Sequence, residues 1–416
     1  MKQLIPDYIT KIEGHGVIKV DFNHATAKLE VAEGERLFEG LLLNQPAQQA
    51  IYLTSRICGV CPIAHQLAAA KALEAAAGLK INSTDQSLRQ LLHANQIISS
   101  HLIHLFFLAL PDFSNDDSSL DLAAKYPAEF HLVLNLKRLV DQINQLVGGG
   151  TVHPTTIAVG GLNRHPAPTQ ISQIKDTIEE VLDEATDFAR LFANLPYPRL
   201  QRNCELFCLD DNENYSFDGG DVIGSRGSRW LASDYAGQLT EEIRPYASAK
   251  FAVRRGRPLG VGALARLMLM HRRLRPEAMV ILRKAERPLK NDPFLNNLAQ
   301  AIEIVHFLYQ ARDICYQLLN DGMEPVKSLP NKLPAGEGVG AVEAPRGILY
   351  HHYIIDKEGK ISYANIITPT VQNLTAIEED CRQLLRGNPD KNENELKKLI
   401  EMLIRSYDPC LTCSVH

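Results

Sequence analysis

The chain has 416 residues, of which 45% are hydrophobic and 22% charged, and its 44 basic and 49 acidic side chains give a formal net charge of −5. This composition is typical of a globular protein with a large buried core, and it excludes the disordered and fibrous classes. The charges are interspersed along the chain, so no basic face predicts nucleic acid as a partner.

The predicted elements begin with short strands and continue with helices. Two apolar runs of strand length, 17–22 and 27–31, predict a small hairpin. Helical spacing then predicts a helix from residue 63 to Gly78 and a second over 83–110, which we expect Pro111 to end. Further helices are expected over 170–195, 262–272, 293–319, 376–385 and 392–406.

The C-terminal third contains a segment of different character. Residues 327–347 are dense in Pro and Gly, and 348–366 predict a small antiparallel piece around a turn at 356–359. The whole pattern predicts a mainly α fold with small β appendages in a single domain, 1–416. We expect it to be built from N-terminal strands and loops (1–55), a helical core (56–325), a Pro/Gly-rich and β segment (326–374) and C-terminal helices (375–416).

No segment predicts membrane insertion or export. The apolar stretch over 64–79 is broken by Gln66, Lys71 and Glu74, well short of about 20 uninterrupted apolar residues. The first ten residues lack the cationic start and apolar run of a signal peptide. We therefore expect a cytoplasmic protein.

Four of the eight cysteines form two C-x-x-C pairs near opposite ends of the chain, Cys58 with Cys61 and Cys410 with Cys413. Thiolates separated by two residues can converge on one soft metal ion. The remaining cysteines lack metal-cluster spacing, so we expect small buried hydrophobic side chains at Cys204, Cys208, Cys315 and Cys381.

A structural zinc site is the simplest alternative for two such pairs. Zinc ribbons usually separate their pairs by about 15 to 20 residues, whereas these pairs lie near the two ends of the chain. A thioredoxin-like dithiol would explain only one pair. The wide separation favours a metal centre that forms once the whole chain has folded.

The motifs from Arg56 to His65 (RICGVCPIAH) and from Asp408 to His416 (DPCLTCSVH) resemble the two signature motifs of nickel-iron hydrogenase large subunits. The resemblance continues in the family's order through KIEGH at 11–15, VGG at 159–161, SAKF at 248–251, VGALAR at 261–266 and EAPRG at 343–347. It implies that family's fold, in which a helical bundle core brings the two cysteine motifs together. It also implies reversible cleavage of H2 into two protons and two electrons.

By this resemblance all four cysteines bind nickel, and Cys61 and Cys413 also bridge to an iron that carries carbonyl and cyanide ligands. Cys58 and Cys410 would be terminal ligands. The resemblance implies that Cys410 first accepts the proton and that Glu13 receives it next. From its own surroundings in the sequence, Glu13 would be a solvated surface group.

Arg346 matches an arginine above the open side of the two metals, where a fixed cation could polarise H2. Asp112 and Asp408 are expected to hold its guanidinium, although a surface salt bridge at Arg346 and a helix-end role for Asp112 are the alternatives. Arg346 and Thr370 are expected to donate hydrogen bonds to the cyanides, and Pro345 belongs to the same cofactor-binding segment.

Two histidines are expected to act near the metals without binding nickel. His65 lies one helical turn after Cys61 and could hydrogen-bond a sulfur, with a core histidine bonded to a carbonyl as the alternative. The resemblance implies that His416 binds Mg²⁺ together with Glu39 and the main-chain carbonyl near Ile366.

The electrons released from H2 need an acceptor, and the cysteine spacing of this chain predicts no iron-sulfur cluster of its own. The resemblance implies a small subunit that carries iron-sulfur clusters. The wording of the motifs, with Leu110-Pro-Asp112, is most similar to the cytosolic bidirectional group that couples to NAD(P) or a deazaflavin, which implies further diaphorase-type subunits. A hydrogen-sensing regulatory subunit and a non-catalytic electron-transfer scaffold of the same fold are the alternatives, and the presence of all four thiols argues against the scaffold.

Overall fold

A computed structural model describes residues 9–114, 119–215 and 217–415. Its main helices are α1 (Phe38–Leu42), α2 (Gln49–Thr54), α3 (Pro62–Ala77), α4 (Ser83–Ile103), α5 (Pro111–Ser114), α6 (Ser119–Lys125), α7 (Pro127–Ile143), α8 (Pro168–Ala193), α9 (Ala263–Met270), α10 (Pro276–Lys284), α11 (Asn296–Asp321), α12 (Pro369–Gly387) and α13 (Glu393–Ser406). The strands are β1 (Gly16–Asp21), β2 (Thr26–Val31), β3 (Ile157–Ala158), β4 (Gly161–Leu162), β5 (Glu205–Asp210), β6 (Asp221–Gly224), β7 (Arg229–Trp230), β8 (Thr240–Ile243), β9 (Lys250–Val253), β10 (Leu259–Gly260), β11 (Gly336–Ala344), β12 (Gly347–Ile355) and β13 (Ile361–Ile367).

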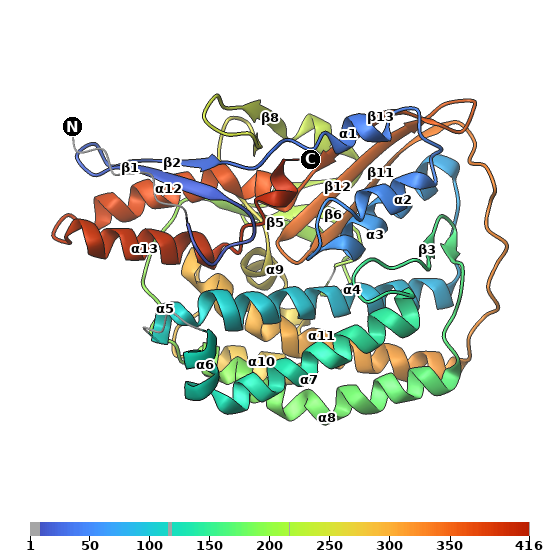
Figure 1. Ribbon diagram of the computed structural model, residues 1–416, viewed down its shortest axis with the longest axis horizontal. Helices are drawn as coiled ribbons and strands as arrows, with labels where there is room; N and C mark the ends of the chain where they lie inside the picture. Colours follow the sequence, from blue (N-terminus) through green and yellow to red (C-terminus); the bar gives the residue numbers. More distant parts are fainter. Residues whose placement is uncertain (1–8, 115–118, 216, 416) are drawn as a thin grey trace.

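A layer of long helices carries the small sheets on one side. Helices α4, α7, α8 and α11 run side by side in the lower half of Figure 1, and the sheets lie above them with both ends of the chain. The stripe expected on α8 is buried as predicted, including Ile171, Ile174 and Ile178. The predicted mainly α fold with small β appendages is confirmed.

The strand pairings are local, apart from one. The pairs β1–β2, β3–β4 and β8–β9 are antiparallel, and the three-stranded sheet has the order β11-β12-β13 with Ala344 opposite Gly347 at its first turn. In the four-stranded sheet of order β10-β5-β6-β7, β10 pairs parallel to β5. The hairpin expected over 17–31 is β1–β2, with Val17 opposite Glu30.

Strand β11 corrects the expectation of an irregular Pro/Gly-rich segment. Three of its residues, Gly336, Gly338 and Gly340, face α3 so closely that an added Cβ would collide with the helix backbone at Ala76, Ala72 and Ala68 respectively. Glycine on the strand and alanine on the helix therefore allow an unusually close helix–strand approach. This contact positions both the start of α3, where Cys61 lies, and the β11–β12 turn that carries Arg346.

Pro111 begins a helix instead of only ending one. Helix α4 passes into a π-helical segment, His104–Ala109, and Pro111 is the first residue of α5, a position where proline's missing N–H costs little. The apolar segment Ser83–Ser114 is long enough and apolar enough to span a membrane, a property that the sequence analysis overlooked. In the most apolar 18-residue stretch of this segment, 67% is buried inside the protein, which is typical of a core helix.

The buried His93 on α4 predicts a pH dependence of stability. Its Nε2 donates to the carbonyl oxygen of Glu343 at 2.9 Å, and burial lowers its pKa from 6.5 to about 4. The folded protein therefore keeps this ring neutral, and the stability it contributes above pH 6.5 is lost as the pH falls toward and below 4, by about 3 kcal/mol in total. We expect His93→Gln, which can keep the donor, to flatten this part of the pH profile in denaturant unfolding. An unchanged slope between pH 6.5 and 4 would contradict the assignment.

Candidate metal centre

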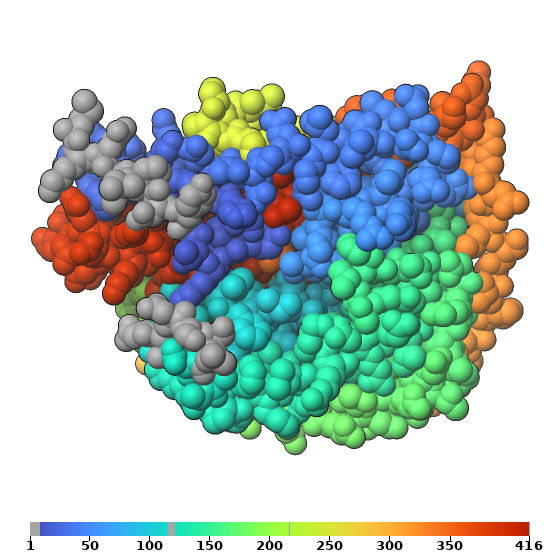
Figure 2. Space-filling view, viewed as in Figure 1, coloured from blue at the N-terminus to red at the C-terminus, as the bar shows by residue number. Residues whose placement is uncertain are grey.

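Backbone hydrogen bonds join the N-terminal and C-terminal segments of the described chain at the site. Glu13 forms a bridge with Cys410, and the N–H of Leu411 donates to the carbonyl of Glu13 at 2.9 Å. Farther along, the N–H of Arg36 donates to the carbonyl of Val415 at 3.0 Å. In Figure 2 a small area of C-terminal residues (red) is bordered by N-terminal residues (blue). The second cysteine motif therefore depends on the N-terminal segment for its position.

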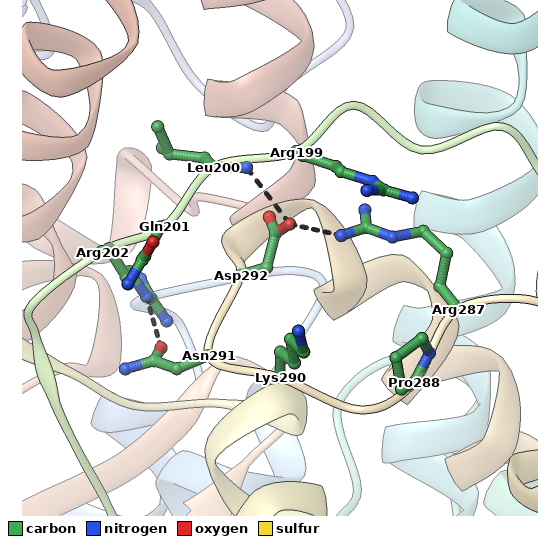
Figure 3. A pocket seen from close by; sticks show the side chains of 9 residues that line it. All are labelled: Arg199, Leu200, Gln201, Arg202, Arg287, Pro288, Lys290, Asn291 and Asp292. Atoms are coloured by element: carbon green, nitrogen blue, oxygen red, sulfur yellow. Dashed lines mark hydrogen bonds and ion pairs between the residues drawn. The ribbon is translucent and has the colours of Figure 1, made fainter. Parts of the chain in front are cut away.

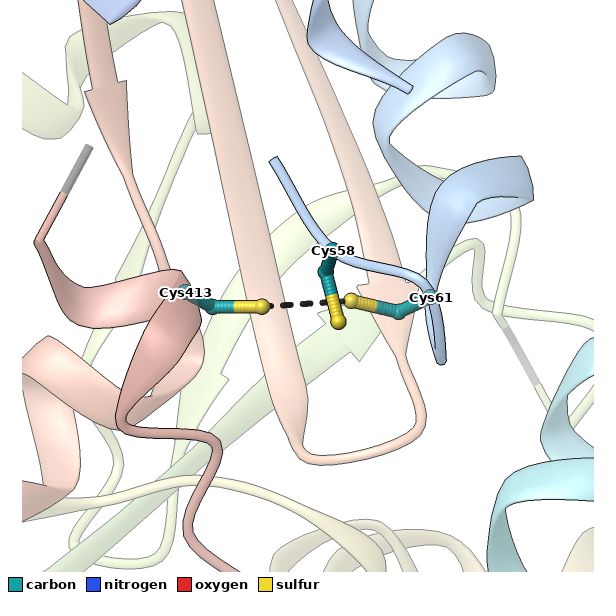
Figure 4. A group of neighbouring side chains, drawn as sticks. All are labelled: Cys58, Cys61 and Cys413. Atoms are coloured by element: carbon teal, nitrogen blue, oxygen red, sulfur yellow. Dashed lines mark hydrogen bonds between the residues drawn. The ribbon is translucent and has the colours of Figure 1, made fainter. Parts of the chain in front are cut away.

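Four buried sulfurs converge where the motifs meet. Cys58 Sγ lies 3.5 Å from Cys410 Sγ, and Cys61 Sγ lies 3.4 Å from Cys413 Sγ. The sulfurs of Cys410 and Cys413 are 2.8 Å apart. Figure 4 shows Cys58 and Cys61 facing Cys413 across the gap between the motifs. None of the four sulfurs is in a disulfide, so the cluster has the ligand atoms for a soft metal.

Local structure explains why each pair points inward. Cys61 occupies the position before the first turn of α3, and Pro62 starts that helix. Between the two cysteines the chain turns tightly, with the N–H of Val60 donating to Cys58 Sγ at 3.3 Å. At the other pair, Asp408 adopts a left-handed conformation with φ of 51°, which turns the chain from α13 into the motif.

The electrostatics of the cluster suit a bound cation. Hydrogen bonds from Cys410, and then from Cys413 and Cys61, hold the pKa of Cys58 well below its ordinary value. Burial raises the pKa of Cys410 and of Cys413 well above the ordinary value of a thiol. A metal ion binds deprotonated thiolates and would offset the cost of burying their charge.

Glu13 lies directly beside the sulfurs. Cys410 Sγ donates to Glu13 Oε2 at 2.7 Å, and the three groups Glu13, Cys58 and Cys410 have ligand atoms within 4.8 Å of one another. The side chain is half-buried instead of freely solvated. A proton on the Cys410 sulfur thus has a carboxylate oxygen within one hydrogen bond.

Of the two aspartates expected to hold Arg346, Asp408 does so. The Nε of Arg346 donates to the Asp408 carbonyl at 2.5 Å and its Nη2 to Asp408 Oδ1 at 2.8 Å. Burial disfavours charge on Arg346, yet Asp408 and the thiols of Cys410 and Cys61 raise its pKa well above the ordinary value. Its Nη1 is buried without a hydrogen-bond partner, so the two N–H groups on this atom remain for a group that the chain itself does not supply.

The expected contact between Asp112 and Arg346 is wrong. Both oxygens of Asp112 accept from Arg405, at 2.8 Å from Nε and 2.7 Å from Nη2. Arg405 lies in the last turn of α13, and Asp112 lies in α5, so this ion pair joins the two helices. Asp112 therefore anchors the helix before the second cysteine motif and does not touch the arginine above it.

Thr370, Pro345 and His65 lie close to the motifs in different ways. Thr370 Oγ1 accepts the N–H of Cys410 at 3.0 Å, which leaves its hydroxyl proton available as a donor. The carbonyl of Pro345 accepts from Arg266 at 3.0 Å. His65 Nδ1 lies 3.1 Å from His351 Nε2, so this nitrogen faces a second histidine, a partner that the sequence analysis did not name.

The residues expected to bind Mg²⁺ form a polar cluster of their own. Glu39 accepts from the N–H of Ile366 at 2.8 Å, from Asn365 Nδ2 at 3.0 Å and from Lys250 Nζ at 3.1 Å. His416 lies outside the described residues. Glu241 on β8, which lies 3.5 Å from Lys250, was not predicted, because two adjacent acids on a short strand carry no metal-ligand spacing.

Other side chains that complete the site also went unpredicted. Gln300 on α11 donates to Asp408 Oδ2 at 3.0 Å, and its own Oε1 lies 2.5 Å from His104 Nδ1. His104 in turn reaches the carbonyl of Arg405 at 2.7 Å. The sequence predicted only that these residues lie in helices, and the contacts that join α11 to the C-terminal motif give them a role.

Two cavities in the described part of the chain are lined by residues other than the four cysteines. A surface pocket of about 540 Å³ is lined by four basic side chains, and Figure 3 shows Arg287 paired with Asp292 and Arg202 with Asn291 there. A much smaller cavity of about 10 Å³ shares Arg202 with this pocket and is also lined by Arg346 and Tyr407. Arg346 is therefore the site residue that lines this small cavity.

Comparisons with known proteins agree with this site. A family model described as nickel-dependent hydrogenase matches residues 36–129 and 230–416. Sulfhydrogenase 1 subunit alpha of Pyrococcus furiosus is 33% identical over 417 residues, which cover 99% of this chain and 97% of the relative. The NAD-reducing hydrogenase HoxS subunit beta of Cupriavidus necator is 30% identical over 469 residues, which cover 100% and 95%.

A solved structure extends the agreement to three dimensions. The crystal structure of an NAD+-reducing NiFe hydrogenase in the H2-reduced state matches with a TM-score of 0.85 and 26% identity over 100% of both chains. The predicted family, fold and enzyme class are confirmed. The chain belongs to the nickel-dependent hydrogenase family, as the catalytic large subunit of a NiFe hydrogenase.

Proposed function

We propose that Cys58, Cys61, Cys410 and Cys413 hold the nickel, and that Cys61 and Cys413 also bridge to the iron. The observation that carries this proposal is the convergence of four buried, unbridged sulfurs, with 2.8 Å between the closest pair. The unpartnered Nη1 of Arg346 fits a strong acceptor such as an iron-bound cyanide. When bound, a nickel-iron centre with carbonyl and cyanide ligands on iron would accept the electron pair of H2.

The chain's own groups then handle the proton. In our proposal the Cys410 sulfur accepts the proton of cleaved H2, and the proton moves to Glu13 Oε2 along the 2.7 Å contact. Arg346, fixed by Asp408, keeps its positive charge near the cysteine sulfurs, where it would favour the separation of charge. Thr370 holds the backbone of Cys410 and could donate its hydroxyl proton to a cyanide.

We further propose that a small subunit with iron-sulfur clusters covers α1 and α2. Leu37, Leu41 and Tyr52 are large apolar side chains that stand exposed there, just before the first cysteine motif. Electrons from the metals would leave to the clusters of this subunit. Relatives named NAD-reducing and F420-non-reducing hydrogenase subunits support a soluble cytoplasmic complex in which diaphorase-type subunits reduce NAD(P) or a similar carrier.

The proposed function is tested on the purified complex. We expect one nickel per large subunit, iron in excess of nickel because the iron-sulfur clusters of the small subunit add to it, H2-dependent reduction of a viologen dye, and infrared bands of metal-bound carbonyl and cyanide. Zinc alone, with no infrared bands and no dye reduction, would overturn the proposal. Slow dye reduction with intact bands would instead indicate the hydrogen sensor.

We also propose that Glu39 binds Mg²⁺. Three donors already contact its two oxygens, and a carboxylate has about four acceptor directions, so one direction on Oε2 remains. We expect Glu39→Gln to lose one equivalent of magnesium, measured by elemental analysis, with nickel retained. Glu33→Gln, whose carboxylate contacts His15 at 2.9 Å, is the matched control and should keep the magnesium. Equal magnesium in the Glu39 variant would refute the assignment.

A further inference from the structure

The guanidinium of Arg266 is a buried charge next to the metal centre that the proposed chemistry does not use. Arg266 lies on α9, is 0% exposed and is the largest fully buried side chain among the described residues. Burying a charge is costly unless it is fully paired and hydrogen-bonded. The hydrogen-bond partners of Arg266 therefore indicate its role.

All five N–H groups of Arg266 are used. Nε and Nη2 form a fork on Glu303, both at 2.7 Å, and Nη1 donates to Glu343 at 2.8 Å. The two remaining donors reach the carbonyls of Ala344 at 3.2 Å and Pro345 at 3.0 Å. These carbonyls belong to the two residues that immediately precede Arg346, so the guanidinium grips the backbone of the turn that presents it.

The acids of this clamp are anchored by other elements. Glu303 on α11 also contacts His101 at 2.7 Å and accepts from the hydroxyl of Tyr215 at 2.6 Å. Glu343 at the end of β11 accepts the N–H of Leu209 at 2.8 Å. Arg266 thus connects the turn to α11 through Glu303 and, through Glu343, to β5.

The β11–β12 turn is also tightly packed against Val261 and Gly262. Gly347 has a φ of 129°, and an added Cβ would lie 2.5 Å from Val261 Cγ2. Gly262 has a φ of 116°, and its added Cβ would lie 3.0 Å from the carbonyl oxygen of Arg346. The backbone at Arg346 is therefore pressed against the start of the helix that carries Arg266.

We propose that Arg266 is a positioning residue, which fixes the carbonyls of Ala344 and Pro345 so that the Arg346 guanidinium stands in one place beside the four sulfurs. The proposal rests on the function proposed above for Arg346. It differs from a general stabilising role because the effect on turnover should pass through Arg346.

The test is a double-substitution cycle in the purified complex. Arg266→Lys keeps the charge but cannot form the fork and both carbonyl contacts together. We expect it to lower H2-dependent dye reduction about 10- to 100-fold, as expected for a misplaced reacting group, with nickel content unchanged. In an Arg346→Lys background the same change should alter the rate less than about twofold, because coupled residues are not additive.

Arg89 provides a matched control. It also pairs with a buried acid, Glu74, at 2.6 and 3.0 Å, and grips the carbonyls of Ala158 at 2.7 Å and Gly161 at 3.1 Å. We expect Arg89→Lys to lower the thermal midpoint as Arg266→Lys does, while the turnover of the folded complex stays within about twofold.

Three outcomes would overturn the proposal: additive losses in the cycle, an equal loss of turnover in Arg89→Lys, or unchanged turnover in Arg266→Lys. If Arg266→Lys does not accumulate, Glu343→Gln weakens the same clamp and must show the same dependence on Arg346. If Arg346→Lys alone leaves turnover unchanged, the function proposed for Arg346 fails, which the cycle distinguishes from failure of the positioning role.

Discussion

We expect Cys410→Ser to lose both nickel and H2-dependent activity, to below about one-thousandth of the unmodified rate. A serine hydroxyl stays protonated and is a hard ligand, so it replaces neither the soft thiolate nor the base that lies 2.7 Å from Glu13. Elemental analysis and dye reduction measure the two losses on the same sample.

A second buried cysteine serves as its control. Cys204 is buried and its sulfur contacts only the carbonyl of Glu205, at 3.5 Å, so Cys204→Ser removes a thiol outside the cluster. We expect that variant to retain nickel and activity. Full nickel and turnover in Cys410→Ser would exclude this sulfur as ligand and base.

Glu13→Gln should separate proton transfer from metal binding. The amide can still contact Cys410 Sγ but cannot take up and release a proton, so isotope exchange between D2 and water should fall by about 10²- to 10⁴-fold. Nickel and iron should be retained, because the four sulfurs keep their contacts without Glu13.

Two further variants sharpen this test. Glu13→Asp keeps an ionisable group on a shorter side chain and should restore part of the exchange. Glu33→Gln removes a nearby carboxylate that accepts from the N–H of His15 at 2.7 Å and should leave exchange unchanged. Exchange at the full rate in Glu13→Gln would show that the proton leaves by another group.

Much of the fold was predictable where one periodicity dominated. The helical periodicity over 170–195 and the two apolar runs of strand length over 17–31 are local patterns, and the structure follows both within a few residues. Strand β11 was not predictable in this way, because its glycines signal a loop unless the alanine face of α3 is known to pack on them. The N-terminal boundary of α12 was also missed, since Pro369 at its first position looks like a helix breaker in isolation.

The candidate site divides along the same line. The two C-x-x-C pairs carry their chemistry in their spacing, and the sulfurs do converge. The partner of Asp112 could not be predicted, because Arg346 and Arg405 are both arginines and only the path of α13 decides which of them reaches it. Arg266 and Gln300 carry no signal apart from burial, since their contacts join elements distant in the chain.

Anomalous diffraction from crystals of the purified complex, recorded at the nickel and iron absorption edges, tests the bimetallic assignment most directly. We expect one nickel peak enclosed by the sulfurs of Cys58, Cys61, Cys410 and Cys413, and one iron peak beside Cys61 and Cys413 on the side that Arg346 Nη1 faces. A single peak at the zinc edge among the four sulfurs, with no iron next to it, would contradict the assignment.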